Sequence, residues 1–98
     1  MRFELRLART AERQLLALPA HHRATVRAAL ETHLRHEPMK TSKSRIKHMR
    51  GLNRPQYRLR VDEFRVYYDV IGQEVQVLAI VSKTEAAEWL AAFGEAEP

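Results

Sequence analysis

The sequence contains no cysteine and has few residues of three other kinds, with three glycines, four prolines and one tryptophan. Without cysteine, the chain cannot form disulfide bonds and cannot use a thiolate as a nucleophile or metal ligand. It also lacks an apolar run of the roughly 20 residues needed to cross a bilayer. Charged residues at Arg2, Glu4 and Arg6 interrupt the start of the chain, so we expect no secretory signal. These absences predict a small cytoplasmic protein with no membrane segment.

Positive charge is abundant and unevenly distributed. The 98 residues include 17 lysines and arginines against 12 acidic residues, a formal net charge of +5, and 45% are hydrophobic. This length and apolar content suit one folded domain over residues 1–98. Between residues 40 and 65 only Asp62 and Glu63 oppose the basic side chains of Lys40, Lys43, Arg45, Lys47, Arg50, Arg54, Arg58, Arg60 and Arg65. Such a local excess indicates an acidic partner.

Two neighbouring segments, residues 57–61 and 64–70, alternate between apolar and polar residues with a period of two. This pattern is typical of half-buried strands, and the two residues between them fit a tight hairpin turn. If the apolar sets share a core, the opposite face of the sheet carries Arg58, Arg60 and Arg65. Clustered guanidinium groups repel one another, and a bound nucleic-acid backbone relieves that repulsion.

The first half of the chain predicts one strand followed by two helices. Residues 2–7 alternate like a strand. A helix with Thr10 as its N-cap ends at Pro19, and a second helix then runs to about Glu37, where Pro38 stops it. The second helix has an apolar stripe of Val26, Leu30 and Leu34, which we expect to be buried.

The second half predicts an exposed basic loop over residues 40–47, the hairpin, and a third strand. That strand, residues 75–81, is apolar on both faces and is expected at the centre of the sheet. A last helix, residues 86–93, is expected to pack Trp89 and Phe93 into the core, followed by a frayed tail. The order predicts an α+β fold with an N-terminal strand, a helical hairpin, a mainly antiparallel four-stranded sheet and a C-terminal helix.

Four segments form one extended motif: Met49-Arg-Gly-Leu52, Tyr57-Arg-Leu-Arg-Val61, Phe64-Arg-Val-Tyr-Tyr-Asp-Val70 and Val75-Gln-Val-Leu-Ala-Ile80. With the order of elements, this motif resembles the RelE/ParE superfamily, the toxins of type II toxin–antitoxin systems, from residue 2 to about residue 93. The RelE-like branch is the more similar. This resemblance implies a metal-independent endoribonuclease that cleaves messenger RNA on the ribosome and needs no cofactor. In that reaction the 2′-hydroxyl attacks the adjacent phosphorus and leaves a 2′,3′-cyclic phosphate.

The resemblance also implies residue roles and partners. Arg58 and Arg60 would bind the phosphate, and Arg65 would stabilise the charge of the transition state. The implied partners are a cognate acidic antitoxin, the ribosome with its messenger RNA, and operator DNA bound by a toxin–antitoxin hetero-oligomer.

The proton-transfer group is not fixed by the motif. Where the RelE pattern has an arginine and a C-terminal tyrosine, this chain has Lys83-Thr84 and Trp89-Leu90. Lys83 remains a catalytic candidate because neighbouring arginines lower the pKa of a lysine. Tyr67 is the other candidate, on the arginine-bearing face, where a phenol can relay a proton or stack on a base.

The basic loop supplies the candidate RNA-binding residues Lys43, Arg45, Lys47, His48 and Arg50. The same surface also suits an acidic antitoxin. His33 and His36 have a spacing that two metal ligands use, but no third ligand is near in sequence, so we expect a solvated helix face and no metal site.

Two other functions fit parts of the sequence. A ParE-like toxin shares the fold and inhibits DNA gyrase without cleaving RNA, and it does not need the arginines of the sheet. An inactive module that only binds RNA or antitoxin would explain the absence of a tyrosine after Tyr68.

Overall fold

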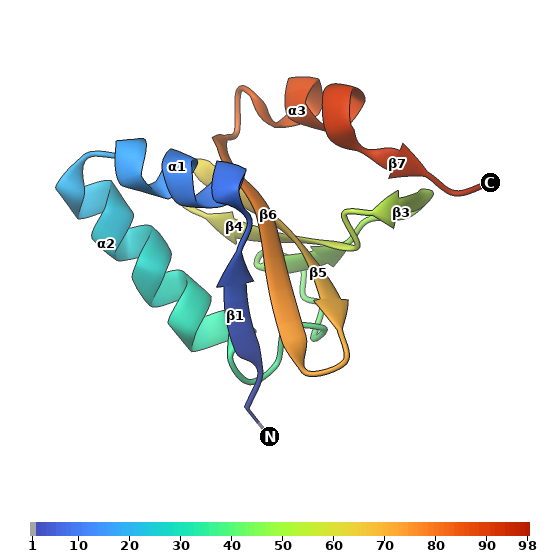
Figure 1. Cartoon of the computed structure of the whole chain (residues 1–98), viewed down its shortest axis with the longest axis horizontal. Helices are drawn as coiled ribbons and strands as arrows, with labels where there is room; N and C mark the ends of the chain where they lie inside the picture. Colours follow the sequence, from blue (N-terminus) through green and yellow to red (C-terminus); the bar gives the residue numbers. More distant parts are fainter. Residues whose placement is uncertain (1) are drawn as a thin grey trace.

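A five-stranded sheet with the strand order β1-β6-β5-β4-β2 forms the centre of the computed structural model, which describes residues 2–98 (Figure 1). β1 runs parallel to β6, and the other neighbouring strands are antiparallel. The strands are β1 (Glu4–Leu7), β2 (Ile46–His48), β4 (Tyr57–Val61), β5 (Phe64–Ile71) and β6 (Glu74–Ser82). The predicted strands are therefore confirmed, and residues 75–81 lie in an interior strand, although β5 and not β6 occupies the middle of the sheet.

Two helices, α1 (Arg9–Ala17) and α2 (Ala20–Ala29), form the predicted helical hairpin and pack against one face of the sheet (Figure 1). A π-helical segment, η1 (Leu30–Leu34), continues α2, so helical structure ends at Leu34 and not near Glu37. The predicted stripe of the second helix is buried in the core.

The predicted N-cap is wrong. α1 begins one residue before Thr10, and its N-cap is Ala8, which makes no side-chain cap hydrogen bond. The end of β1 fixes this start instead, since the backbone N–H of Ala8 donates to the carbonyl of Val77 at 2.9 Å. Strand pairing therefore outweighs the local capping preference of threonine.

A bulge in β6 changes which face its side chains occupy. Tyr68 pairs with Val77, but the preceding Tyr67 pairs with Ala79, so Leu78 is skipped in the register. The extra residue moves the alternation by one position. Val75 and Val77 consequently lie in the core under α1 and α2, whereas Ala79 and Val81 lie on the other face. The strict alternation expected for residues 75–81 is wrong at this point.

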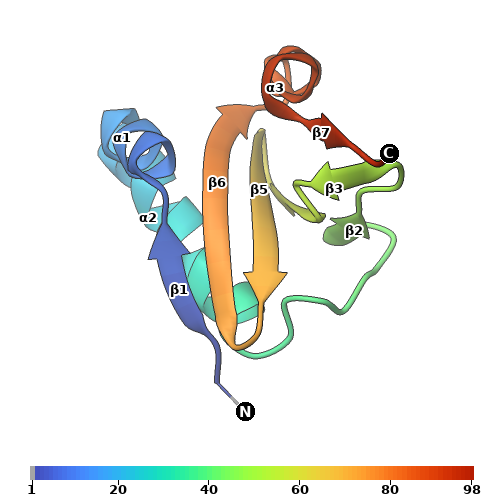
Figure 2. The same cartoon turned by 45° about the vertical axis from the view of Figure 1, so that its right-hand side comes forward.

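Two further strand pairings were not predicted. β2 lies inside the segment expected to be a loop, and it adds a fifth strand at the edge of the sheet. β3 (Leu52–Arg54) and β7 (Glu95–Ala96) form a separate two-stranded sheet, so the expected frayed tail is instead paired. Figure 2 shows how this pairing returns the chain from α3 (Ala86–Phe93) toward β3.

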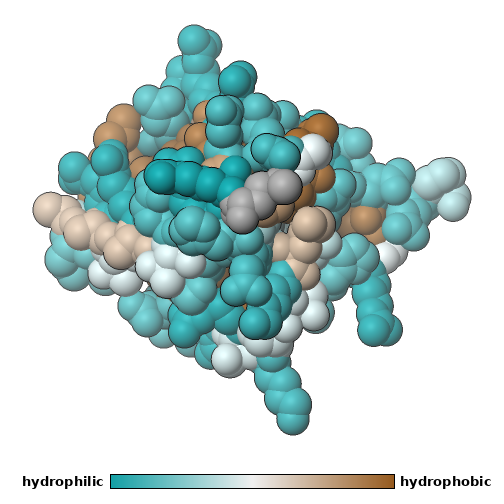
Figure 3. Space-filling model, turned by 90° about the horizontal axis from the view of Figure 1, so that it is seen from below, coloured by the Kyte–Doolittle hydropathy of each residue, from teal (hydrophilic) through white to brown (hydrophobic). Residues whose placement is uncertain are grey.

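The α+β class is confirmed, and the helices cover the two sides of the sheet to different extents. α1 and α2 cover one side of the sheet, and α3 stands over one end of β5 and β6 (Figures 1 and 2). Viewed from below, from the side of the N-terminus, the surface is mostly hydrophilic with small hydrophobic patches (Figure 3). Within residues 2–98, no helix has the length and apolar character needed to span a bilayer.

Candidate functional site

The strand register brings the three predicted arginines together on one side of the sheet. Arg60 lies directly opposite Arg65, and Arg58 lies opposite Tyr67. On the other side of β4, Arg58 is paired with Lys47 of β2. Directly opposed residues of antiparallel strands project to the same side of a sheet. We call the surface made by Lys47, Arg58, Arg60, Arg65 and Tyr67 the arginine face.

The positive charge of this face is not neutralised by the protein. Among the residues that the structure describes, no carboxylate lies within ion-pair distance of Arg58, Arg60 or Arg65. One terminal nitrogen of Arg65 donates to the carbonyl oxygens of Asp62 and Phe64, each at 2.9 Å. Burial, and then the charges of Arg60 and Arg58, lower the pKa of Arg65, although an arginine stays protonated near neutral pH. The three guanidinium groups therefore lie close enough to repel one another.

One donor on the arginine face has no protein partner. The Nε–H group of Arg58 is buried and makes no hydrogen bond in the described part of the chain. Buried polar groups in folded proteins are nearly always hydrogen-bonded, so such a donor is a reason to look for a ligand. A phosphate oxygen is a suitable acceptor for it.

Tyr67 lies on the arginine face but under α3. It is 1% exposed, and its ring stacks on that of Trp89 at a centroid distance of 4.9 Å and an angle of 10°. Burial raises the pKa of the Tyr67 hydroxyl, and the charges of Arg58 and Arg65 oppose this rise. Tyr67 is therefore a neutral phenol near neutral pH, beside the arginines and covered by an indole ring.

Lys83 lies at the tip of the β4–β5 hairpin. Its ammonium group is 3.1 Å from a carboxylate oxygen of Glu63, and its backbone N–H donates to the Glu63 carbonyl at 2.7 Å. Both side chains of this ion pair are exposed to solvent. The ion pair with Glu63 therefore holds the Lys83 ammonium group, which would have to leave this partner to act elsewhere.

The predicted RNA-binding residues divide into separate groups. Lys47 belongs to the arginine face, and Lys43 and Arg45 are exposed in the loop before β2. His48 lies on the opposite face, where its ring contacts Tyr57 at 5.2 Å edge to face. Arg50 is exposed in the turn before β3. The structure thus brings Lys47 to the arginines and separates His48 from them.

Sequence reasoning missed what covers the arginine face. Ala86, Trp89 and Leu90 of α3 pack with Met49 on a small cluster formed by Tyr67, Ala79 and Val81. Trp89 was expected in the main core, and Phe93 was expected beside it, but Phe93 is 64% exposed. The apolar stripe of the last helix shows that this helix packs against the protein but not against which face of the sheet. The single tryptophan was the one residue in the sequence that could have indicated this contact.

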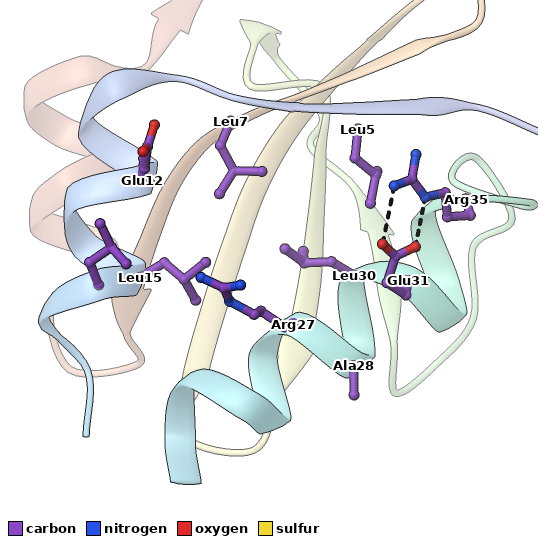
Figure 4. A pocket seen from close by; sticks show the side chains of 10 residues that line it. Leu5, Leu7, Glu12, Leu15, Arg27, Ala28, Leu30, Glu31 and Arg35 are labelled. Atoms are coloured by element: carbon purple, nitrogen blue, oxygen red, sulfur yellow. Dashed lines mark hydrogen bonds and ion pairs between the residues drawn. The ribbon is translucent and has the colours of Figure 1, made fainter. Parts of the chain in front are cut away.

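A hollow of about 570 Å³ lies away from the arginine face, between β1 and the helices α1 and α2. In Figure 4, Leu5, Leu7 and Leu30 line this hollow, and the ion pair of Arg35 with Glu31 lies at its rim. Its lining is mostly aliphatic. Because it brings no acid–base pair or cationic cluster together, we base the candidate site on the arginine face and not on cavity size.

Comparison with known families places the chain. Residues 5–87 match the model of the family described as the ParE toxin of type II toxin–antitoxin systems. The chain belongs to this toxin family. No curated protein matches it significantly in sequence.

Three solved structures are similar to this family member. The RelBE2 toxin–antitoxin complex from Mycobacterium tuberculosis has a chain 22% identical to it, with a TM-score of 0.66, covering 85% of this chain and 100% of that one. The RelB–RelE complex from Methanococcus jannaschii gives 20% identity, 85% and 95% coverage, and a TM-score of 0.65. The RelE–RelB complex from Pyrococcus horikoshii OT3 gives 21% identity, 85% and 97% coverage, and a TM-score of 0.69.

These findings establish the RelE/ParE superfamily and its fold. The family model is that of ParE, whereas the similar solved structures contain RelE. The choice between the two activities therefore depends on the chemistry of the site itself.

Proposed function

We propose that this toxin is a RelE-like endoribonuclease that cleaves messenger RNA on the ribosome, in the cytoplasm, without a metal ion. The observation that carries the proposal is the register that sets Arg60 opposite Arg65, with Arg58 beside them and no carboxylate partner for any of the three within residues 2–98. An RNA phosphodiester supplies the negative charge that this surface lacks.

In the proposed reaction, the 2′-hydroxyl of the RNA gives its proton to solvent water, and its oxygen forms a bond to the adjacent phosphorus while the bond from phosphorus to the 5′-oxygen breaks. The products are a 2′,3′-cyclic phosphate and a 5′-hydroxyl. Negative charge grows on the two non-bridging oxygens, where fixed guanidinium donors stabilise it. Arg58 and Arg60 hold the phosphate, and Arg65, which the carbonyls of the hairpin keep in place, stabilises the transition state.

Tyr67 is the better candidate for the proton donor. A phenol that stays neutral near pH 7 can donate a proton to the departing 5′-oxygen, and Arg58 lies directly across the strand pair from it. Its use requires Trp89 to move away from its ring. Lys83 is the second candidate and would first have to leave Glu63.

We further propose a cognate acidic antitoxin as the partner that neutralises this toxin. The similar solved structures are complexes of RelE with RelB antitoxins. A net charge of +5, concentrated on the arginine face and the neighbouring loop, favours an acidic partner. Such a pair would assemble into a hetero-oligomer on operator DNA.

Inhibition of DNA gyrase is the second candidate function. It is favoured by the ParE family match and by the state of the proton-transfer candidates, since Tyr67 is buried and Lys83 is ion-paired. A toxin that acts only by binding needs no accessible acid or base.

Expression of Arg65→Ala beside the wild type tests the proposal, with Arg9→Ala as the control, because Arg9 is an exposed arginine at the start of α1. We expect growth arrest and new messenger RNA ends, mapped by primer extension, for the wild type and Arg9→Ala. Arg65→Ala should cleave about 10²–10³-fold more slowly, the usual cost of losing one transition-state donor. Intact messenger RNA together with loss of gyrase supercoiling would establish the second function instead.

A further inference from the structure

A hollow of about 430 Å³ opens from the arginine face at the hairpin tip. It is lined by Ser44, Arg45, Arg60, Asp62 and Glu63, and we call it the hairpin hollow. Arg60 connects it to the arginine face. Of its two carboxylates, Glu63 is paired with Lys83, so the hollow has two arginines against one unpaired carboxylate.

A second hollow of about 380 Å³ lies where η1 and the following segment meet the loop before β2. Its lining includes His33, His36, Lys40, Ser44 and Arg45, and we call it the distal hollow. Ser44 and Arg45 line both hollows. The two hollows therefore share this part of the loop before β2.

The lining of the distal hollow is rich in hydrogen-bond donors, and it also includes the carboxylate of Glu37. Arg45 has no carboxylate partner in the described part of the chain, and the pair of Lys40 with Glu37 is exposed at 3.5 Å, so it is weak. Burial, and then the charge of Arg45, lower the pKa of His33. Hydroxyl and imidazole N–H groups complement the two cations as donors.

The loop that carries these donors is held in shape by its own hydrogen bonds. The Ser42 backbone N–H donates to the carbonyl of Ile46 at 2.9 Å, and the Arg45 backbone N–H donates to the Ser42 hydroxyl at 3.0 Å. Ile46 is also the single aliphatic residue of the distal hollow's lining, and it is buried. An amphipathic protein helix would find one aliphatic side chain here, whereas a sugar–phosphate backbone would find two cations and several hydroxyl groups.

We propose that the distal hollow is a second phosphate-binding subsite, which holds the same RNA strand that the arginine face cleaves. The strand passes from the arginine face through the hairpin hollow, crosses Arg45, and places a further phosphate between Lys40 and the imidazoles. This assignment rests on the proposed ribonuclease function. The affinity of the toxin would then depend on the length of the RNA as well as on the contacts to the scissile phosphate.

The test measures binding of 2′-O-methyl oligoribonucleotides, which lack the attacking hydroxyl, to the purified full-length toxin by fluorescence anisotropy. Probes of three and nine nucleotides are compared for Lys40→Ala and for Arg9→Ala. Arg9 is the control because it is an exposed basic residue at the start of α1 that lines neither hollow. Arg60→Ala reports on the arginine face itself.

We expect Lys40→Ala to weaken binding of the nine-nucleotide probe several-fold and to leave the three-nucleotide probe unchanged. The slope of log affinity against log salt should become shallower by about 0.7, the value for one phosphate contact on a single strand. Arg9→Ala should have little effect on either probe, and Arg60→Ala should weaken both.

Equal losses for Lys40→Ala and Arg9→Ala would overturn the subsite, because the net charge of the protein would then explain the loss without a local phosphate contact. The subsite would also be overturned if Lys40→Ala weakened the binding of a polyglutamate peptide but not the binding of RNA. The occupant of the distal hollow would then be an acidic protein. If Arg60→Ala also leaves both probes unaffected, the ribonuclease function itself fails, so the two failures can be told apart.

Discussion

The two faces of the central sheet differ in what they contribute. Beneath α1 and α2, the side chains of Leu59, Val66, Val75 and Val77 are completely buried in one continuous core. On the other face, the buried side chains in the described part of the sheet are those of Tyr67, Ala79 and Val81, together with the Asp69 carboxylate, which is paired with Arg54 at 3.0 Å. α3 has no buried residue of its own. One face therefore supplies most of the folding free energy, which leaves the other face able to carry unpaired charge.

Adjacent tyrosines of β5 show the contrast within two residues. Tyr68 points into the main core, where its hydroxyl donates to the Pro38 carbonyl at 2.6 Å and burial raises its pKa. Tyr67 points the other way, makes no hydrogen bond through its hydroxyl in the described structure, and is covered by Trp89. Two tyrosines with nearly the same burial thus lie in different environments. Tyr68 belongs to the main core, and Tyr67 belongs to the arginine face.

The largest expected effect comes from deleting a core side chain. Leu59→Ala should lower the free energy of unfolding by about 2–5 kcal/mol, because it leaves a cavity at a completely buried position. Arg60→Ala, on the opposite face of the same strand, should change it by less than about 0.5 kcal/mol. Urea denaturation of both variants measures the difference. Comparable losses at the two positions would mean that the arginine face also stabilises the fold.

A smaller effect is expected from removing single hydroxyl groups. Tyr68→Phe leaves the buried Pro38 carbonyl without its donor, so we expect a loss of about 1–3 kcal/mol in the free energy of unfolding. Tyr67→Phe should be close to neutral in stability, within about 0.5 kcal/mol, and should lower the rate of RNA cleavage. A cleavage rate unchanged in Tyr67→Phe would exclude Tyr67 as the proton donor.

A loss of stability smaller than that of Tyr68→Phe is expected at Trp89. Trp89→Ala removes the stacked partner of Tyr67, at a cost of about 1 kcal/mol for the aromatic pair. Since burial raises the pKa of Tyr67, exposing its ring should lower that pKa, and the charges of Arg58 and Arg65 should lower it further. Absorbance titration of the phenolate, with Tyr67→Phe as the reference, measures the change. An unaltered titration would show that α3 does not control access to this hydroxyl.

The sequence predicted the arginine face well because two long strands and a two-residue turn leave little freedom. Period-two alternation determines which side chains share a face once the strands are paired, and the observed register sets Arg58, Arg60 and Arg65 together. The two-residue turn between β4 and β5 requires a positive φ of 49° at Asp62, a conformation that aspartate adopts more readily than most residues.

Other features depend on contacts that no local pattern reveals. β2 has one apolar residue, Ile46, among polar neighbours, and it becomes a strand only because β4 offers an edge to pair with. β7 consists of Glu95 and Ala96, which have low strand propensity, and it is ordered by pairing with β3. The skipped Leu78 could not be inferred either, since apolar residues occupy both faces of β6.

The parallel pairing of β1 with β6 also affects how the toxin emerges during translation. Leu5 finds its neighbour Val75 only after most of the polypeptide has been made, so a nascent chain cannot close its sheet early. Prematurely terminated products lack the strand that joins the first segment to the hairpin. The five-stranded sheet can therefore be completed only after the chain has been synthesised through Ser82, the last residue of β6.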